Sequence, residues 1–205
     1  DADGRFHGYL YSAGVVGAFD VQLPSAVETF GRGINNHGVI VGGIRDASAF
    51  IHGFVQTGGS YGPLDLGNGT FTQINGINDV GDIVGLYHDG SRFHGFLSSG
   101  GAFTTITVPG SSYTVAWGID SAGRIVGDYF IGGNDRHGFL YSEGVFIPID
   151  VPGVTNGSFA LGNNDIGQIV GAYPDDRLGF HTSRGFALSG APIITPPPPP
   201  THRRW

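Results

Sequence analysis

The strongest constraint on this chain is a ten-residue block, Gly-Ile-Asn-x-x-Gly-x-Ile-Val-Gly, that occurs four times with few changes. Its copies occupy residues 33–42, 76–85, 118–127 and 162–171, so successive starts are 43, 42 and 44 residues apart. A second block, His-Gly-Phe-Leu, alternates with the first at residues 7–10, 52–55, 94–97 and 137–140, with a degenerate fifth copy at 184–188. A repeat of this length is typical of the blades of a β-propeller.

Turn chemistry divides each repeat into four short strands. Asn or Asp followed by Gly comes directly after the first strand, at residues 35–38, 78–81, 120–123 and 164–167. This pattern favours a tight turn, because an Asn or Asp side chain bonds its own backbone and Gly accepts a positive φ. Further turn residues separate strands three and four, and Pro-Gly at 109–110 and 152–153 ends the fourth. Three tight connections and one longer one are the pattern of a four-stranded meander that crosses to the next blade.

The composition agrees with an all-β chain. Only two residues are Glu, all ten basic residues are Arg, and there is no Met, so good helix formers are scarce. The 38 Gly and 12 Pro would suggest disorder in an unpatterned chain, but the periodic glycines and a hydrophobic fraction of 40% predict a core. We therefore expect a small all-β propeller over residues 1–190, closed by both termini, and a Pro-rich tail over 191–205. Four blades are preferred, and five are the alternative.

Charge and composition exclude several kinds of partner. A net charge of -7 with ten scattered Arg argues against a nucleic-acid-binding surface. The absence of Cys excludes disulfides and thiolate metal sites, and no phosphate loop, dinucleotide fingerprint or metalloprotease motif indicates a cofactor or metal. No apolar run approaches the roughly 18 residues of a membrane helix, so membrane insertion is not expected. Because the sequence starts at Asp1 without an initiator Met, we expect a processed product, which fits secretion.

Together with Ile-Asp-Val-Pro-Gly, the two blocks resemble the HAF repeat family of predicted bacterial extracellular proteins. That family is named for a His-Ala-Phe segment, which appears here as His-Gly-Phe or His-Gly-Tyr. The resemblance covers residues 3–190 and departs at Asn163, in place of Ile, and at Arg184, in place of His. It implies a bacterial extracellular or cell-surface repeat fold, and it supplies no catalytic residues.

The strand count leaves one strand too many. The sequence holds four copies of strand types one, two and four, but five of type three. In a closed four-bladed ring, the closing blade would take strands one and two from the C-terminal end and strands three and four from the N-terminal end. Residues 7–11 and 184–188 then compete for one position. The surplus strand either adds to a blade edge or to a fifth incomplete blade, or it pairs with a neighbouring molecule. The assembly candidates are His7, Gly8, Tyr9, Leu10, Arg184, Gly185, Phe186 and Leu188.

A candidate ligand site comes from the position before each Gly-Ile-Asn block, which varies in an otherwise regular repeat. It is occupied by Arg32, Asn75, Trp117 and Leu161. If the first strand is innermost, these side chains line one mouth of the channel, where Trp117 would stack on a sugar while Arg32 and Asn75 donate hydrogen bonds. Ordinary variation in packing is the alternative.

The repeated His7, His52, His94 and His137 are predicted to be structural, each bonding a neighbouring backbone group. They would lie on separate blades, where only inward-facing copies near the axis could share a metal ion. The acidic loops before the third strands offer too few oxygens for calcium. No carboxylate pair or Ser/His/Asp set stands out, so no catalysis is expected. The sequence thus predicts a non-catalytic secreted structural or interaction protein that assembles into oligomers or filaments by strand exchange. A lectin that binds an extracellular glycan is the alternative, and a propeller glycoside hydrolase or lyase is the second alternative.

Overall fold

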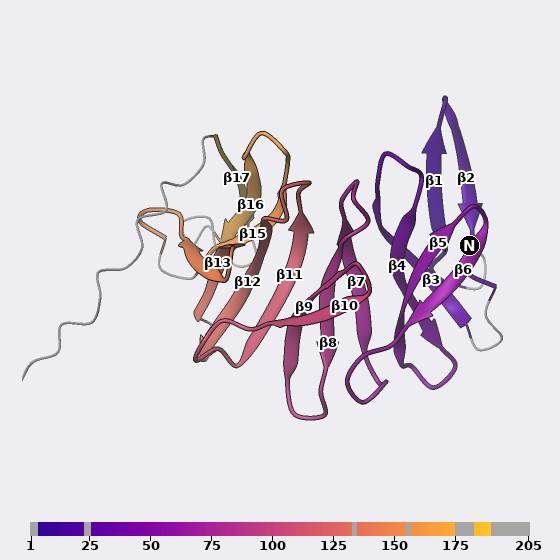
Figure 1. Cartoon of the computed structure of the whole chain (residues 1–205), viewed down its shortest axis with the longest axis horizontal. Helices are drawn as coiled ribbons and strands as arrows, with labels where there is room; N and C mark the ends of the chain where they lie inside the picture. The colour runs from indigo at the N-terminus through magenta and orange to yellow at the C-terminus, as the bar shows by residue number, and fades with distance from the viewer. Residues whose placement is uncertain (1–3, 23–25, 133–134, 155–156, 175–182, 190–205) are drawn as a thin grey trace, which may run out of the picture.

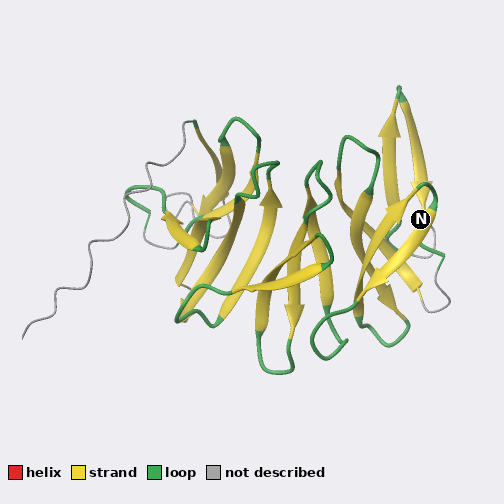
Figure 2. Ribbon diagram, in the orientation of Figure 1, coloured by secondary structure: helices red, strands yellow, loops and turns green. Residues whose placement is uncertain are grey.

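The computed structural model describes residues 4–22, 26–132, 135–154, 157–174 and 183–189. Within these ranges every regular element is a strand, and all pairings between the strands are antiparallel (Figures 1 and 2). The predicted tail lies outside the described residues.

The strands form sheets that follow chain order. A two-stranded hairpin comes first, with β1 (Gly8–Ser12) and β2 (Val15–Phe19). Blade 1 contains β3 (Ala26–Ile34), β4 (Ile40–Asp46), β5 (Ile51–Thr57) and β6 (Ser60–Leu64). Blade 2 contains β7 (Thr72–Ile77), β8 (Ile83–His88), β9 (Phe93–Ser99) and β10 (Ala102–Ile106). Blade 3 contains β11 (Tyr113–Ile119), β12 (Ile125–Gly132), β13 (Asp135–Ser142) and β14 (Val145–Ile149). Blade 4 contains β15 (Phe159–Asn163), β16 (Ile169–Pro174) and β17 (Ser183–Leu188). The fold is a four-bladed β-propeller, as the repeat predicts.

The centre of each blade is a glycine on the second strand under an aromatic ring from the third. In blade 3, a Cβ added at Gly127 would lie 2.0 Å from the carbonyl oxygen of Val115 and 2.6 Å from the ring of Phe139. The same close approach occurs at Gly42, Gly85 and Gly171. Only glycine allows the three strands to come this close. The Ile-Val-Gly end of the first block is therefore a packing requirement.

Neighbouring blades are tied together by the Asn or Asp turns between strands one and two. The side-chain amide of Asn35 donates to the carbonyl oxygen of Asn78 at 3.1 Å, and that of Asn78 donates to the carbonyl oxygen of Asp120 at 3.0 Å. The backbone N–H of Asn36 donates to Asp79 at 2.8 Å. The regular spacing of these turns thus serves contacts between blades as well as the local turn.

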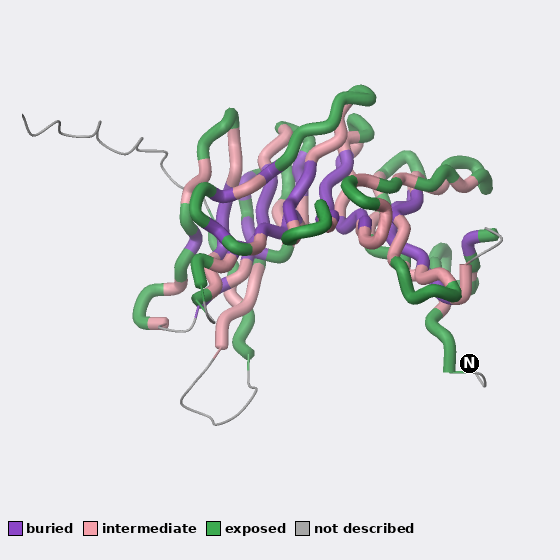
Figure 3. Tube along the Cα trace, turned by 90° about the horizontal axis from the view of Figure 1, so that it is seen from below, coloured by how far each residue is buried: buried purple, intermediate pink, exposed green. Residues whose placement is uncertain are grey.

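Apolar packing between blades forms the core. Val41 of blade 1 clusters with Ile74 and Ile83 of blade 2, and Val126 of blade 3 clusters with Ala160 of blade 4. Buried residues consequently lie along the middle of the row of blades, while turns and outer strands are exposed (Figure 3). Each blade relies on the next one to cover its second strand.

Among the described residues, the two ends of the chain do not share a closing blade as expected. β17 pairs with β16 as the third strand of blade 4, while β1 and β2 form a separate sheet. Figure 1 places this hairpin and blade 4 at opposite ends of the longest axis. The prediction of five third strands is confirmed by β1, β5, β9, β13 and β17. Both segments that compete for the third-strand position of the closing blade, residues 7–11 and 184–188, therefore form strands.

Candidate functional site

The N-terminal hairpin is the outer half of a blade. Gly8 of β1 pairs with Phe19 of β2 in the same register as Gly53 with Leu64 and Gly95 with Ile106 in the complete blades. β1 and β2 therefore correspond to strands three and four. No first and second strands pair with β1 among the described residues, so one long edge of the hairpin lacks the sheet that other third strands have.

The missing strands leave an aromatic ring exposed. Tyr9 occupies the position of Phe54, Phe96 and Phe139, which are each 0% exposed, yet Tyr9 is 73% exposed. The three phenylalanines pack on a second-strand glycine, whereas no second strand lies beside β1 in the described part of the chain. Tyr9 is thus a core residue of an incomplete blade. Tyr11, Val15 and Val16 add to the exposed apolar surface of the same hairpin, and Phe6, just before β1, is also exposed.

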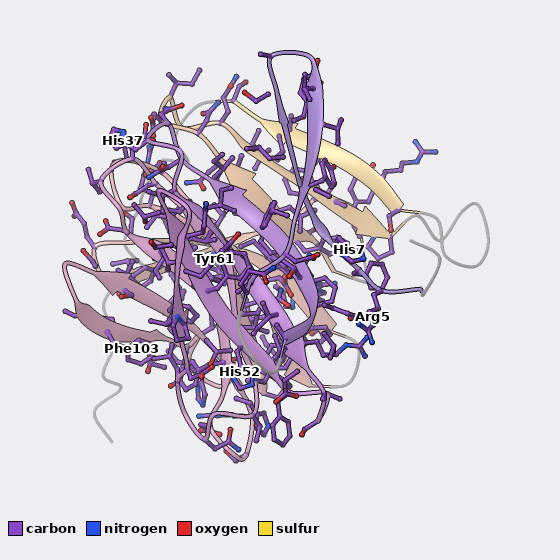
Figure 4. All side chains as sticks on the ribbon, turned by 90° about the vertical axis from the view of Figure 1, so that its right-hand side faces the viewer. Arg5, His7, His37, His52, Tyr61 and Phe103 are labelled. Atoms are coloured by element: carbon purple, nitrogen blue, oxygen red, sulfur yellow. The ribbon has the colours of Figure 1, made fainter. Side chains whose placement is uncertain are left out.

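A groove of about 620 Å³ lies where the missing strands would be. Residues Phe6 to Tyr11 form one wall, and residues Thr29 to Ile34 with Ile40 form the other. Figure 4 views the molecule from this end, with Arg5 and His7 labelled near the base of the hairpin. The groove is therefore bounded by the third strand of one partial blade and the inner strands of blade 1.

The opposite end of the molecule carries an uncovered blade face. Val170 of β16 is 51% exposed, whereas Val41, Val84 and Val126 at the same position are 0% exposed. Each of those three is covered by the blade that follows it in the chain. Because no further blade follows among the described residues, the face of β16 that would contact it stays open to solvent.

The third strand of blade 4 is packed less completely than its counterparts. Phe186 lies on Gly171 but is only half-buried, and Leu188 is exposed. Arg184 and Gly185 pair with Tyr173 and Ala172. No fourth strand pairs with the outer edge of β17 within the described part of the chain. The structure therefore puts the two groups of assembly candidates at opposite ends, each in a blade that is short of strands.

The candidate ligand residues share a structural feature that the sequence did not reveal. In every blade the register of the first two strands shifts at the residue before Gly-Ile-Asn, which forms a β-bulge. The bulged positions are those of Arg32, Asn75, Trp117 and Leu161. A bulged residue has no direct partner on the next strand, so its side chain is free to vary. This accounts for the variation that the sequence analysis singled out.

The bulge side chains make different contacts. Asn75 is buried, and its amide donates to the carbonyl oxygen of Ala116 at 2.9 Å. The indole N–H of Trp117 donates to Asp128, which is buried and also accepts from Nε of Arg136 at 2.7 Å. Arg32 is exposed and lines the groove beside the hairpin. Two of these three side chains are thus already hydrogen-bonded within the propeller. Sugar binding at these residues stays a prediction.

The repeated histidines form side-chain pairs, which corrects the expected bond to the backbone. Nδ1 of each bonds the residue thirteen positions later, at the end of the fourth strand: His7 with Asp20 at 2.8 Å, His52 with Asp65 at 2.9 Å, His94 with Thr107 at 2.8 Å and His137 with Asp150 at 2.9 Å. This pairing fixes strand four against strand three. A search for Asp at this spacing would have found three of the four pairs.

Two of these imidazoles have a raised pKa. Burial lowers the pKa of His137, but hydrogen bonds and charge attraction from Asp150 and Asp135 outweigh it, and the pKa rises above its usual value. Asp65 and Asp46 act in the same way on His52. The protonated, paired form of each is therefore favoured in the fold.

The described residues contain no group of three or more His, Asp or Glu side chains arranged to hold a metal ion. They also contain no helix of the length and apolarity needed to cross a membrane. No protein-family model and no curated protein matches the chain. The two incomplete blades are therefore the features of the molecule that bear on its function.

Proposed function

We propose that this protein is a non-catalytic, secreted structural or interaction protein that assembles with copies of itself through its N-terminal hairpin. The observation that carries the proposal is the exposure of Tyr9, at 73%, where three equivalent aromatic rings are 0% exposed. A ring at a core position of a repeat is normally covered by its own blade. Burial of apolar area is the main favourable term in association, so this surface favours contact with another β-sheet.

The exposed edge of β1 supports the same proposal. In the described sheets β1 pairs with β2 along one edge, and its other edge faces the groove. An unpaired strand edge offers backbone donors and acceptors to another strand, and adding a strand satisfies them. The hairpin thus combines an open hydrogen-bonding edge with an uncovered apolar face.

The test is the mass of the full chain by light scattering over a range of concentrations, with electron microscopy of any large species. We expect species much larger than the 21.4 kDa monomer. Replacing Tyr9 with Ser should reduce the assembled fraction at least tenfold, because it removes the most exposed apolar ring of the hairpin. A wild-type chain that remains monomeric at every concentration would contradict the proposal.

The matched control is Val80→Ser. Val80 is 70% exposed and lies in a turn of blade 2, away from the hairpin. The Val80→Ser variant loses exposed apolar area without affecting either incomplete blade. We expect it to assemble like the wild type. Equal loss of assembly in both variants would mean that general surface hydrophobicity, and not the hairpin, causes association.

A further inference from the structure

We propose that the groove beside the hairpin receives β15 and β16 of a second copy of this chain, so that two incomplete blades combine into one. This inference rests on the proposed self-assembly and specifies its partner surface. The hairpin supplies strands three and four, and β15 and β16 supply strands one and two. The second copy's own β17 is displaced from β16 in the process.

The strand register supports this pairing. In the four blades, the last residue of the His-Gly-Phe-Leu block, or its equivalent, lies opposite the valine of the second strand: Val55 opposite Val41, Leu97 opposite Val84, Leu140 opposite Val126 and Ala187 opposite Val170. Leu10 holds this position in β1. It would therefore lie opposite Val170 of the second copy, with Tyr9 on the glycine at position 171.

The same placement covers the open face of β16. Val41 packs against Ile74 and Ile83 of the following blade. By alignment of the blades, the residues that correspond to Ile74 and Ile83 in blade 1 are Gly31 and Ile40, because Gly31 pairs with Gly42 as Ile74 pairs with Gly85. Gly31 and Ile40 both line the groove. Val170 of the second copy would contact them, so one docking event covers Tyr9 and Val170 together.

Displacement of β17 is favoured because β17 leaves its sheet less complete and less well covered than β1 would. β17 leaves Leu188 exposed and has no fourth strand among the described residues. β1 is already paired with β2 along its other edge, so pairing of β1 with β16 brings four strands into one sheet. A complete four-stranded blade therefore replaces a three-stranded one.

The geometry also predicts the form of the assembly. The hairpin and blade 4 lie at opposite ends of the longest axis (Figure 1). A contact between unlike ends is heterologous, and its repetition gives either a closed ring of several copies or an open filament. A symmetric dimer through two hairpins does not satisfy the register.

The test uses engineered disulfides in the full chain, which has no native Cys. One preparation carries Leu10→Cys and another carries Val170→Cys, and the two are mixed before mild oxidation. Residues directly opposite on paired strands have Cβ atoms about 4.5–5.5 Å apart, close to the reach of a disulfide. We expect covalent dimers in the mixture, with the linked peptides identified by mass spectrometry, and at least tenfold fewer in either preparation alone.

A matched control shifts the register by one residue. Tyr11→Cys mixed with Val170→Cys puts the first thiol on the opposite face of β1, because side chains alternate along a strand. It should give at least tenfold less cross-linked dimer. Equal cross-linking of the two mixtures would overturn the proposed register.

The remaining outcomes separate this inference from the proposed function. Assembly by light scattering without a disulfide between the two positions would overturn the groove as the docking site and leave self-assembly intact. Disulfides within the Leu10→Cys preparation alone would overturn it in favour of a symmetric contact. A double variant that links within one chain, while the mixture does not link, would show that the hairpin closes on its own blade 4. A chain that never assembles would overturn both proposals.

Discussion

The same substitution should affect stability at the buried copy of one repeat position and assembly at the exposed copy. Phe139 is fully buried, with its ring 6.4 Å from that of Tyr129 and 5.4 Å from that of Phe146. Truncation of a buried Phe to Ala costs about 3–5 kcal/mol, because the transfer free energy is lost and a cavity remains. For a domain of this size, each kcal/mol lowers Tm by about 2–4 °C. Phe139→Ala should therefore lower Tm by roughly 6–20 °C.

Tyr9→Ala should change the stability of the monomer by only about 0.5 kcal/mol, since most of its surface is exposed before the substitution. The assay is urea denaturation followed by fluorescence, at a dilution where light scattering shows a monomer. The same two variants are then compared for assembly at high concentration, where Tyr9→Ala should be the defective one. If Tyr9→Ala destabilises the dilute monomer as much as Phe139→Ala does, the ring is buried in solution and the incomplete blade is not open.

Three further predictions follow from the blade interior, the histidine pairs and the competing strand. Gly127→Ala should destabilise the fold by about 1–3 kcal/mol by denaturation, because its Cβ would lie 2.0 Å from a backbone oxygen; Gly62→Ala, whose Cβ would have its nearest neighbour at 3.8 Å, should change stability by less than about 0.5 kcal/mol. His52 and His137 have a raised pKa in the fold, so their protonated, paired forms stabilise it. This stabilisation is complete below about pH 6.5 and is lost as pH rises through the raised pKa. Tm should therefore fall as pH rises above about 6.5, and it should fall less in His137→Gln than in the wild type. Partly exposed pairs of this kind contribute up to about 1 kcal/mol each. An equal fall in both proteins would contradict the pairing. Phe186→Ser removes the ring that holds β17 on Gly171, so it should accelerate assembly in a light-scattering time course; slower assembly would mean that β17 takes part in the contact.

Much of the fold could be predicted because the repeat records local requirements. The Asn or Asp turns need glycine at a positive φ, and Gly123 has φ of 77° as expected. The glycine of Ile-Val-Gly is required by the approach of three strands. The surplus third strand also follows from counting copies. The bond between each histidine and the fourth strand was missed, because the partner is a Thr at residue 107 in one blade and an Asp in the others.

The blades, their strand types and the surplus strand could all be predicted from the repeat, because they depend on turn chemistry and alternation within about 43 residues. The location of the surplus strand depends instead on how the sheets are arranged in space. Tyr9 and Phe139 occupy the same repeat position, yet one is exposed and the other buried, and Val170 differs from Val126 in the same way. The difference arises from the presence or absence of a neighbouring sheet. Burial depends on which distant strands arrive beside a residue, and a local repeat does not encode whether the last neighbour comes from the same chain or from another.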